Sequence, residues 1–97
     1  MIVCGEAARR ARKGVIRVRV AMNVEREELV EVRVSGDFFA YPEDVVWKLE
    51  EALKGAPITE VLARITAALT EAKLVGCSPS DFAETIIEAI KRAGGGV

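Results

Sequence analysis

Two stretches in the first half of the chain alternate between apolar and polar residues. They are residues 15–22 and 29–35, with the short polar stretch 23–28 between them. Successive side chains of a strand point to opposite faces of a sheet, so each stretch predicts a strand with one buried face. The polar connection predicts an antiparallel hairpin. The side chains expected to point inward are Ile16, Val18, Val20 and Met22 in the first strand and Val30, Val32 and Val34 in the second.

Residues 1–11 show no clear period. Met1 to Cys4 can add a third, edge strand, and two strands alone are only marginally stable. The arginines that follow are good helix formers, so a helix is the alternative for this segment. The sequence leaves both conformations open.

After Gly36 the apolar period changes to 3.6 residues and predicts three helices. The first is expected to begin at Pro42 and to end at Lys54-Gly55. The second is expected to run from about Thr59 until Gly76 closes it. The third has Ser78 as its N-cap and ends before a tail, residues 94–97, that is expected to fray. The expected buried stripes are Val45, Val46, Leu49, Ala52 and Leu53; Val61, Leu62, Ile65, Leu69 and Ala72; and Phe82, Ala83, Ile86 and Ile90.

Strands followed by helices predict an α+β fold with two layers. We expect a roughly three-stranded antiparallel sheet with three helices packed on one face, in a single domain over residues 1–97. The opposite face would carry Arg17, Arg19, Glu31 and Arg33, facing either water or a partner.

Length and composition narrow the classes of function. The chain has 97 residues, of which 51% are hydrophobic and 30% charged, so it should fold, but it is too short for a TIM barrel or a two-lobed cofactor enzyme. No apolar run reaches the ~20 residues of a membrane span, and residues 1–6 contain no readable signal peptide, so we expect a cytoplasmic protein. The chain contains no histidine, which removes most triads and zinc sites. It also has no phosphate-binding loop.

Charge is distributed unevenly along the chain. The net charge is −1, but residues 1–36 carry eight basic and five acidic side chains, whereas residues 37–97 carry six basic and ten acidic ones. The basic half could contact nucleic acid, a phosphate-bearing ligand or an acidic protein, or could be a solvated surface. No aromatic residue interrupts the basic stretch, which argues against binding of single-stranded nucleic acid.

Cys4 and Cys77 are the only cysteines and form no CxxC pattern. We expect two buried, reduced thiols. A Cys4–Cys77 disulfide is the alternative: the chain has no glutamine and a single asparagine, and depletion of these amides suggests a thermophilic source, where intracellular disulfides are less rare.

Four of the five aromatic residues lie between Phe38 and Trp47. Trp47 falls on the polar side of its predicted helix, so it is either covered by another segment or serves as an interface anchor. One of Phe38 and Phe39 should fill the gap between sheet and helices while the other is exposed. Asp37 is expected to accept hydrogen bonds from loop amides or to cap the helix.

Several motifs, in this order and spacing, resemble the C-terminal accessory domain of lipoate–protein ligase. They are Arg12-Lys13-Gly14-Val15-Ile16-Arg17-Val18, Val32-Arg33-Val34-Ser35-Gly36-Asp37-Phe38-Phe39, Tyr41-Pro42-Glu43-Asp44, Leu49 to Gly55, and Gly76-Cys77-Ser78-Pro79-Ser80-Asp81-Phe82. The resemblance covers roughly residues 12–92. The family usually has a Gly-Gly-Lys-like turn before its first long strand, and here Ala11-Arg12-Lys13-Gly14 stands in that place. In archaea this domain can be a separate protein, and the chain has the length of that form.

The resemblance implies a non-catalytic subunit that forms a heterodimer with a catalytic ligase chain. That chain would bind lipoate, ATP and Mg, make lipoyl-adenylate and modify lipoyl-acceptor domains; this chain would bind none of these cofactors, nor nucleic acid or membrane. The family fold is also related to scaffold proteins of iron–sulfur assembly, so the alternative function is sulfur transfer or cluster assembly through Cys77 or Cys4. The candidate partner-binding residues are Gly36, Asp37, Phe38, Phe39 and Trp47, with Arg12, Lys13 and Arg17 as candidate contacts to phosphate or to the partner.

Overall fold

The computed structural model describes residues 1–94 and contains a three-stranded antiparallel sheet. Its strands are β1 (Ile2–Ala11), β2 (Gly14–Asn23) and β3 (Glu28–Gly36), with β2 in the centre. β1 pairs with β2 over its whole length, from Ile2 opposite Asn23 to Ala11 opposite Gly14. The segment for which the sequence allowed a helix is therefore a full edge strand. The predicted fraying of residues 94–97 lies, apart from Gly94, outside the described residues.

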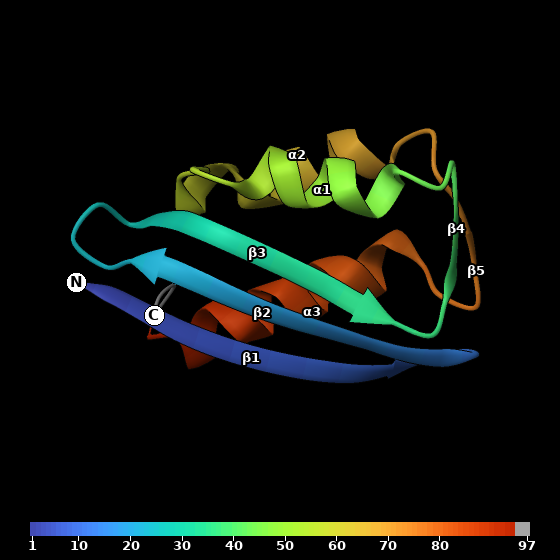
Figure 1. Ribbon diagram of the computed structural model, residues 1–97, viewed down its shortest axis with the longest axis horizontal. Coiled ribbons are helices and arrows are strands. Elements are labelled where there is room, and N and C mark those ends of the chain that lie inside the picture. Colours follow the sequence, from blue (N-terminus) through green and yellow to red (C-terminus); the bar gives the residue numbers. More distant parts are fainter. Residues whose placement is uncertain (95–97) are drawn as a thin grey trace.

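Three helices cover one face of this sheet, as the sequence predicts (Figure 1). α3 (Pro79–Arg92) packs on β1 and β2, and α1 (Val45–Leu53) packs on β3. α2 (Val61–Leu69), preceded by the 3-10 turn η1 (Ile58–Glu60), packs on α1 and α3. Ser78 caps α3 and forms a capping box with Asp81, which fixes where the helix begins. The α+β, two-layer architecture is confirmed.

A second, two-stranded sheet joins β3 to α1 and α2 to α3, and the sequence did not predict it. Its strands are β4 (Phe39–Tyr41) and β5 (Lys73–Val75), with Phe39 opposite Val75 and Tyr41 opposite Lys73. This pairing corrects two predicted boundaries. The first helix begins at Val45 rather than Pro42, and the second ends at Leu69, so that Gly76 follows a strand instead of closing a helix.

A β-bulge in β3 explains one wrong prediction of burial. The register shifts between Ala21, opposite Glu31, and Met22, opposite Leu29, which leaves Val30 without a partner. One extra residue reverses the alternation beyond it. Leu29, Val32 and Val34 are therefore buried, while Val30 is 40% exposed. Leu62, also expected inside, is 54% exposed because α2 buries only a narrow stripe.

The core lies between the sheet and the helices. Its largest fully buried side chains include Phe82, Leu49 and Ile65. α1 is also joined to the edge of the sheet, since the Glu50 carboxylate accepts a 2.7 Å hydrogen bond from the backbone N–H of Val34. The members of the expected stripes that are buried are Ile16, Val18, Val20, Met22, Val32, Val34, Val45, Leu49, Leu53, Val61, Ile65, Leu69, Phe82, Ile86 and Ile90.

Candidate partner-binding site

The turn between β1 and β2 is held between two connections at one end of the molecule. The backbone N–H of Lys13 donates to the carbonyl of Gly76 at 3.0 Å. The backbone N–H of Val15 donates to Oδ1 of Asp37 at 2.6 Å. Asp37 thus accepts a backbone hydrogen bond, as expected, but from strand β2 and not from a loop amide. These bonds join β2, the β3–β4 connection and the β5–α3 connection in one cluster.

Gly36 lets the chain turn from β3 toward β4. Its φ is +151°, and a Cβ there would collide with the carbonyl oxygen of Val15 and approach the Phe38 ring to 3.0 Å. The position therefore requires glycine, because L-residues rarely adopt this φ and the space is filled. Gly36 is a structural part of the site, which places the side chains that follow it.

Phe38 and Phe39 have opposite orientations, as the sequence predicts. The Phe38 ring packs edge-on against Phe82, with ring centroids 5.0 Å apart, and so anchors the connection to the core. Phe39 is 79% exposed. Because alternate residues of a strand share a face, Tyr41, 69% exposed, and Val75, 52% exposed, lie with Phe39 on the outer side of β4–β5. We call Phe39, Tyr41 and Val75 the apolar patch.

Trp47 is 59% exposed, so no other segment within residues 1–94 covers it. It lies on the solvent side of α1, opposite the buried Val45 and Leu49. Of its two predicted states, the covered one is wrong, and its role as an interface anchor stays a prediction. Tyr41 and Val75 were not among the predicted site residues. The aromatic-rich run from Phe38 to Trp47 was a signal for Tyr41, but only the pairing with β5 reveals Val75.

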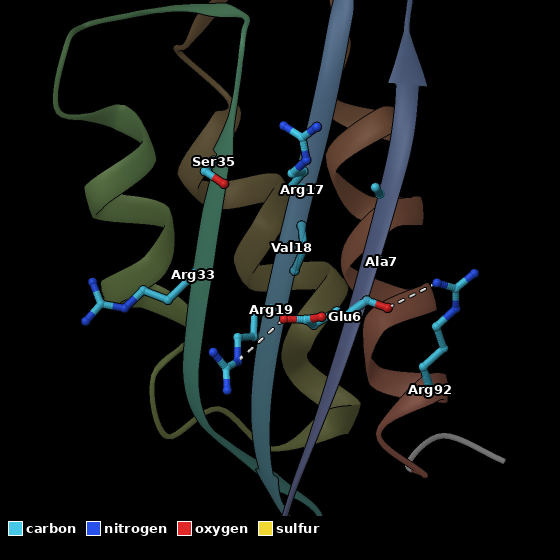
Figure 2. Close-up of a pocket in the computed structure, with 9 residues that line it drawn as sticks. Glu6, Ala7, Arg17, Val18, Arg19, Arg33, Ser35 and Arg92 are labelled. Atoms are coloured by element: carbon cyan, nitrogen blue, oxygen red, sulfur yellow. Dashed lines mark hydrogen bonds and ion pairs between the residues drawn. The ribbon is translucent and has the colours of Figure 1, made fainter.

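The three basic candidates lie beside this cluster. Arg12 and Lys13 occupy the β1–β2 turn and are exposed, and Arg17 projects from β2 on the open face of the sheet. Figure 2 shows Arg17 at the rim of a shallow hollow of about 620 Å³ on that face. The structure thus places Lys13 and Asp37 in one cluster, with Arg17 adjacent to it.

The two thiols are free and lie at opposite ends of the sheet. Cys4 is exposed on β1, so its predicted burial is wrong, and Cys77 is half-buried before α3. The alternative disulfide is not formed. Burial, with a smaller contribution from the carboxylate of Asp81, raises the pKa of the Cys77 thiol above its ordinary value. The position before a helix N-terminus therefore does not activate this thiol.

We expect Cys77 to be alkylated slowly near neutral pH. Because the thiolate is the nucleophile and its pKa is raised, the rate should rise only at a higher pH than for an unfolded thiol. In a Cys4→Ser variant, the rate of iodoacetamide modification measured by mass spectrometry should rise when urea unfolds the chain. Equal rates for folded and unfolded chain at pH about 8 would contradict the raised pKa.

The described residues, 1–94, hold neither a cluster of metal ligands nor a helix that could span a membrane. No group of three or more metal-ligating side chains comes together within them. None of the helices in this range combines the length and apolarity needed to cross a bilayer.

Comparison with known proteins places this fold in a family. No protein-family model matches the chain. Lipoate-protein ligase A subunit 2 of Thermoplasma acidophilum is 31% identical over 78 residues, which are 79% of this chain and 81% of that protein. A solved structure of an archaeal lipoylation system, a bi-partite lipoate protein ligase and its E2 lipoyl domain from the same organism, matches with a TM-score of 0.81 at 29% identity. The match covers 89% of this chain and 97% of the solved one. The chain therefore belongs to the family of lipoate–protein ligase A subunit 2, the accessory subunit of a two-chain lipoate–protein ligase.

Proposed function

We propose that this chain docks on a catalytic lipoate–protein ligase chain through the apolar patch and is required there for activation of lipoate to lipoyl-adenylate. The observation that carries the proposal is the exposure of Phe39 and Tyr41 on a strand pair that hydrogen bonds fix to the sheet. Exposed aromatic residues on a rigid support are the usual anchors of protein interfaces, because they bury a large area at little entropic cost.

Docking would act by shifting a conformational equilibrium of the catalytic chain. A subunit that contributes no reacting group accelerates adenylation only if it binds the competent arrangement more tightly than the other. The cluster of Lys13, Gly36, Asp37 and Phe38 supports such a role, since it can hold the patch at a fixed angle. Trp47, on a different element, would give a second anchor if the partner extends over α1.

In this proposal lipoate, ATP and Mg²⁺ bind to the catalytic chain, and acceptor domains meet this subunit only within the complex. We propose the cytoplasm as the place of action, because a reducing compartment suits two free thiols. Arg12, Lys13 and Arg17 are proposed as contacts to the catalytic chain.

The test is lipoyl-adenylate formation by the catalytic chain from the same source, with and without this protein. The proposal predicts that adenylate forms only when this protein is added, and that the rate saturates at a one-to-one ratio. Bovine serum albumin at the same concentration controls for non-specific stabilisation. Equal adenylate formation in its absence would disprove the requirement.

The alternative, a sulfur-transfer or iron–sulfur scaffold, is not favoured. Such chemistry needs a reactive thiolate or several neighbouring cysteines. Cys4 and Cys77 lie at opposite ends of the sheet, and the pKa of Cys77 is raised by burial.

A further inference from the structure

Four cations at the tip of the β1–β2 hairpin form no ion pair with any residue in 1–94. They are Arg10, Arg12, Lys13 and Arg17, which we call the basic tip. The neighbouring arginines, in contrast, form ion pairs with carboxylates. Arg9 pairs with Glu84 at 3.0 Å and with Asp81 at 3.7 Å. Farther along the open face Arg33 pairs with Glu31 at 3.0 Å and Arg19 with Glu6 at 3.8 Å.

The carboxylate of Asp37 lies at the basic tip but forms no ion pair with any cation in residues 1–94. Oδ1 of Asp37 accepts the backbone N–H of Val15. The tip therefore keeps an excess of positive charge on a protein whose net charge is −1. Charge that is concentrated in this way, rather than spread over the surface, favours an oppositely charged partner.

The basic tip borders the apolar patch. The hydrogen bond from Lys13 to Gly76 places the turn directly beside the end of β5, next to Val75. On the other side of the patch Lys73 stands opposite Tyr41. An apolar centre with a charged rim is the common arrangement of protein interfaces.

The apolar patch alone is too small for a stable heterodimer. If each aromatic side chain has an area of about 200 Å², the exposed parts of Phe39, Tyr41 and Val75 together present roughly 400 Å². A stable interface takes about 800 Å² from each partner. The interface must therefore extend onto adjoining surface, and the basic tip adjoins the patch directly.

We propose that the basic tip docks on an acidic surface of the catalytic ligase chain, as the rim of the interface whose centre is the apolar patch. This deepens the proposed function and rests on it. The tip would speed and orient association, because long-range attraction acts before contact. It would contribute less to the lifetime of the complex, since exposed ion pairs are weak.

The geometry favours an extended acidic surface over a single phosphate group. The four cations of the basic tip are spread along the hairpin, from Arg10 on β1 through the turn to Arg17 on β2, and in Figure 2 the guanidinium group of Arg17 points away from those of Arg19 and Arg33. A single anion requires donors that meet at it.

The test compares two triple variants that lose the same charge. Arg12→Gln/Lys13→Gln/Arg17→Gln removes three cations near the patch. Arg26→Gln/Lys54→Gln/Lys91→Gln removes three exposed cations elsewhere. Association rates with the catalytic chain are measured by stopped-flow at about 50 mM and about 1 M salt, where the Debye length falls to roughly 3 Å.

We expect the tip variant to associate about tenfold more slowly at low salt, the control variant to match the unmodified protein, and the difference to vanish at high salt. An equal slowing of both variants, or of neither, would overturn the inference. An unchanged association rate of the tip variant would also overturn it if that variant instead showed a higher KM for the acceptor domain, a lost affinity for a labelled oligonucleotide, or a changed self-association. The requirement for adenylation is scored separately at saturating subunit, so the two proposals can fail independently.

Discussion

Replacing Gly5 with alanine is expected to lower the free energy of unfolding by about 3 kcal/mol, at the upper end of overpacking effects. α3 crosses β1 so closely at this residue that a Cβ would collide with the carbonyl oxygen of Ala89 and lie 2.5 Å from the backbone nitrogen of Ala93. Both atoms belong to helix backbone or to its C-terminal cap, so no side-chain rotation can relieve the contact. For a domain of this size the loss corresponds to a fall in Tm of roughly 15 °C.

Gly55→Ala is the matched control for this prediction. Gly55 has a φ of +78° but nothing lies within 4 Å of the position a Cβ would take. Its replacement should cost only about 1 kcal/mol, from backbone strain alone. Thermal unfolding followed by circular dichroism measures both variants. A Gly5→Ala protein as stable as Gly55→Ala would show that α3 does not approach β1 this closely.

The sequence predicted the parts of the fold that repeat over many residues. The alternation in residues 15–22 is long enough to fix which side of β2 is buried, and Ser78-Pro79-Ser80-Asp81 specifies the start of α3 through a local capping box. Features that depend on distant pairing were missed. β4 and β5 have three residues each, too few for a period, and the bulge at Val30 is set by the register with β2. The conformation of residues 1–11 was ambiguous in the sequence, because this segment is a strand only through its pairing with β2.

The candidate site divides in the same way. The sequence anticipated that Asp37 accepts a backbone hydrogen bond and that one of Phe38 and Phe39 packs inward. Partner binding by Gly36, Asp37 and Phe38 stays a prediction. Phe39 alone did not define a surface. Its neighbours Tyr41 and Val75 come together only through the β4–β5 pairing, which a one-dimensional pattern does not contain.

Replacing Phe39 and Tyr41 together with alanine is expected to weaken the complex with the catalytic chain roughly 1,000-fold. A central aromatic anchor contributes about 2 kcal/mol or more when it is buried against a partner, and each 1.4 kcal/mol is roughly tenfold in Kd. Because both side chains are exposed in the free subunit, their removal should leave its own stability nearly unchanged. Isothermal titration calorimetry measures Kd, and thermal unfolding checks the fold.

Two comparisons decide what such a loss means. Leu62→Ala removes another exposed apolar side chain, from α2, and should leave Kd unchanged, whereas Trp47→Ala tests whether α1 contributes to the same interface.

If the patch serves docking, a large excess of the double variant must restore adenylate formation to the full rate, since mass action compensates for a weaker complex. A rate that stays low at saturation would mean that Phe39 and Tyr41 also favour the active arrangement of the catalytic chain. An unchanged Kd for the double variant would exclude the apolar patch from the interface, and with it the argument that the interface is centred on β4 and β5.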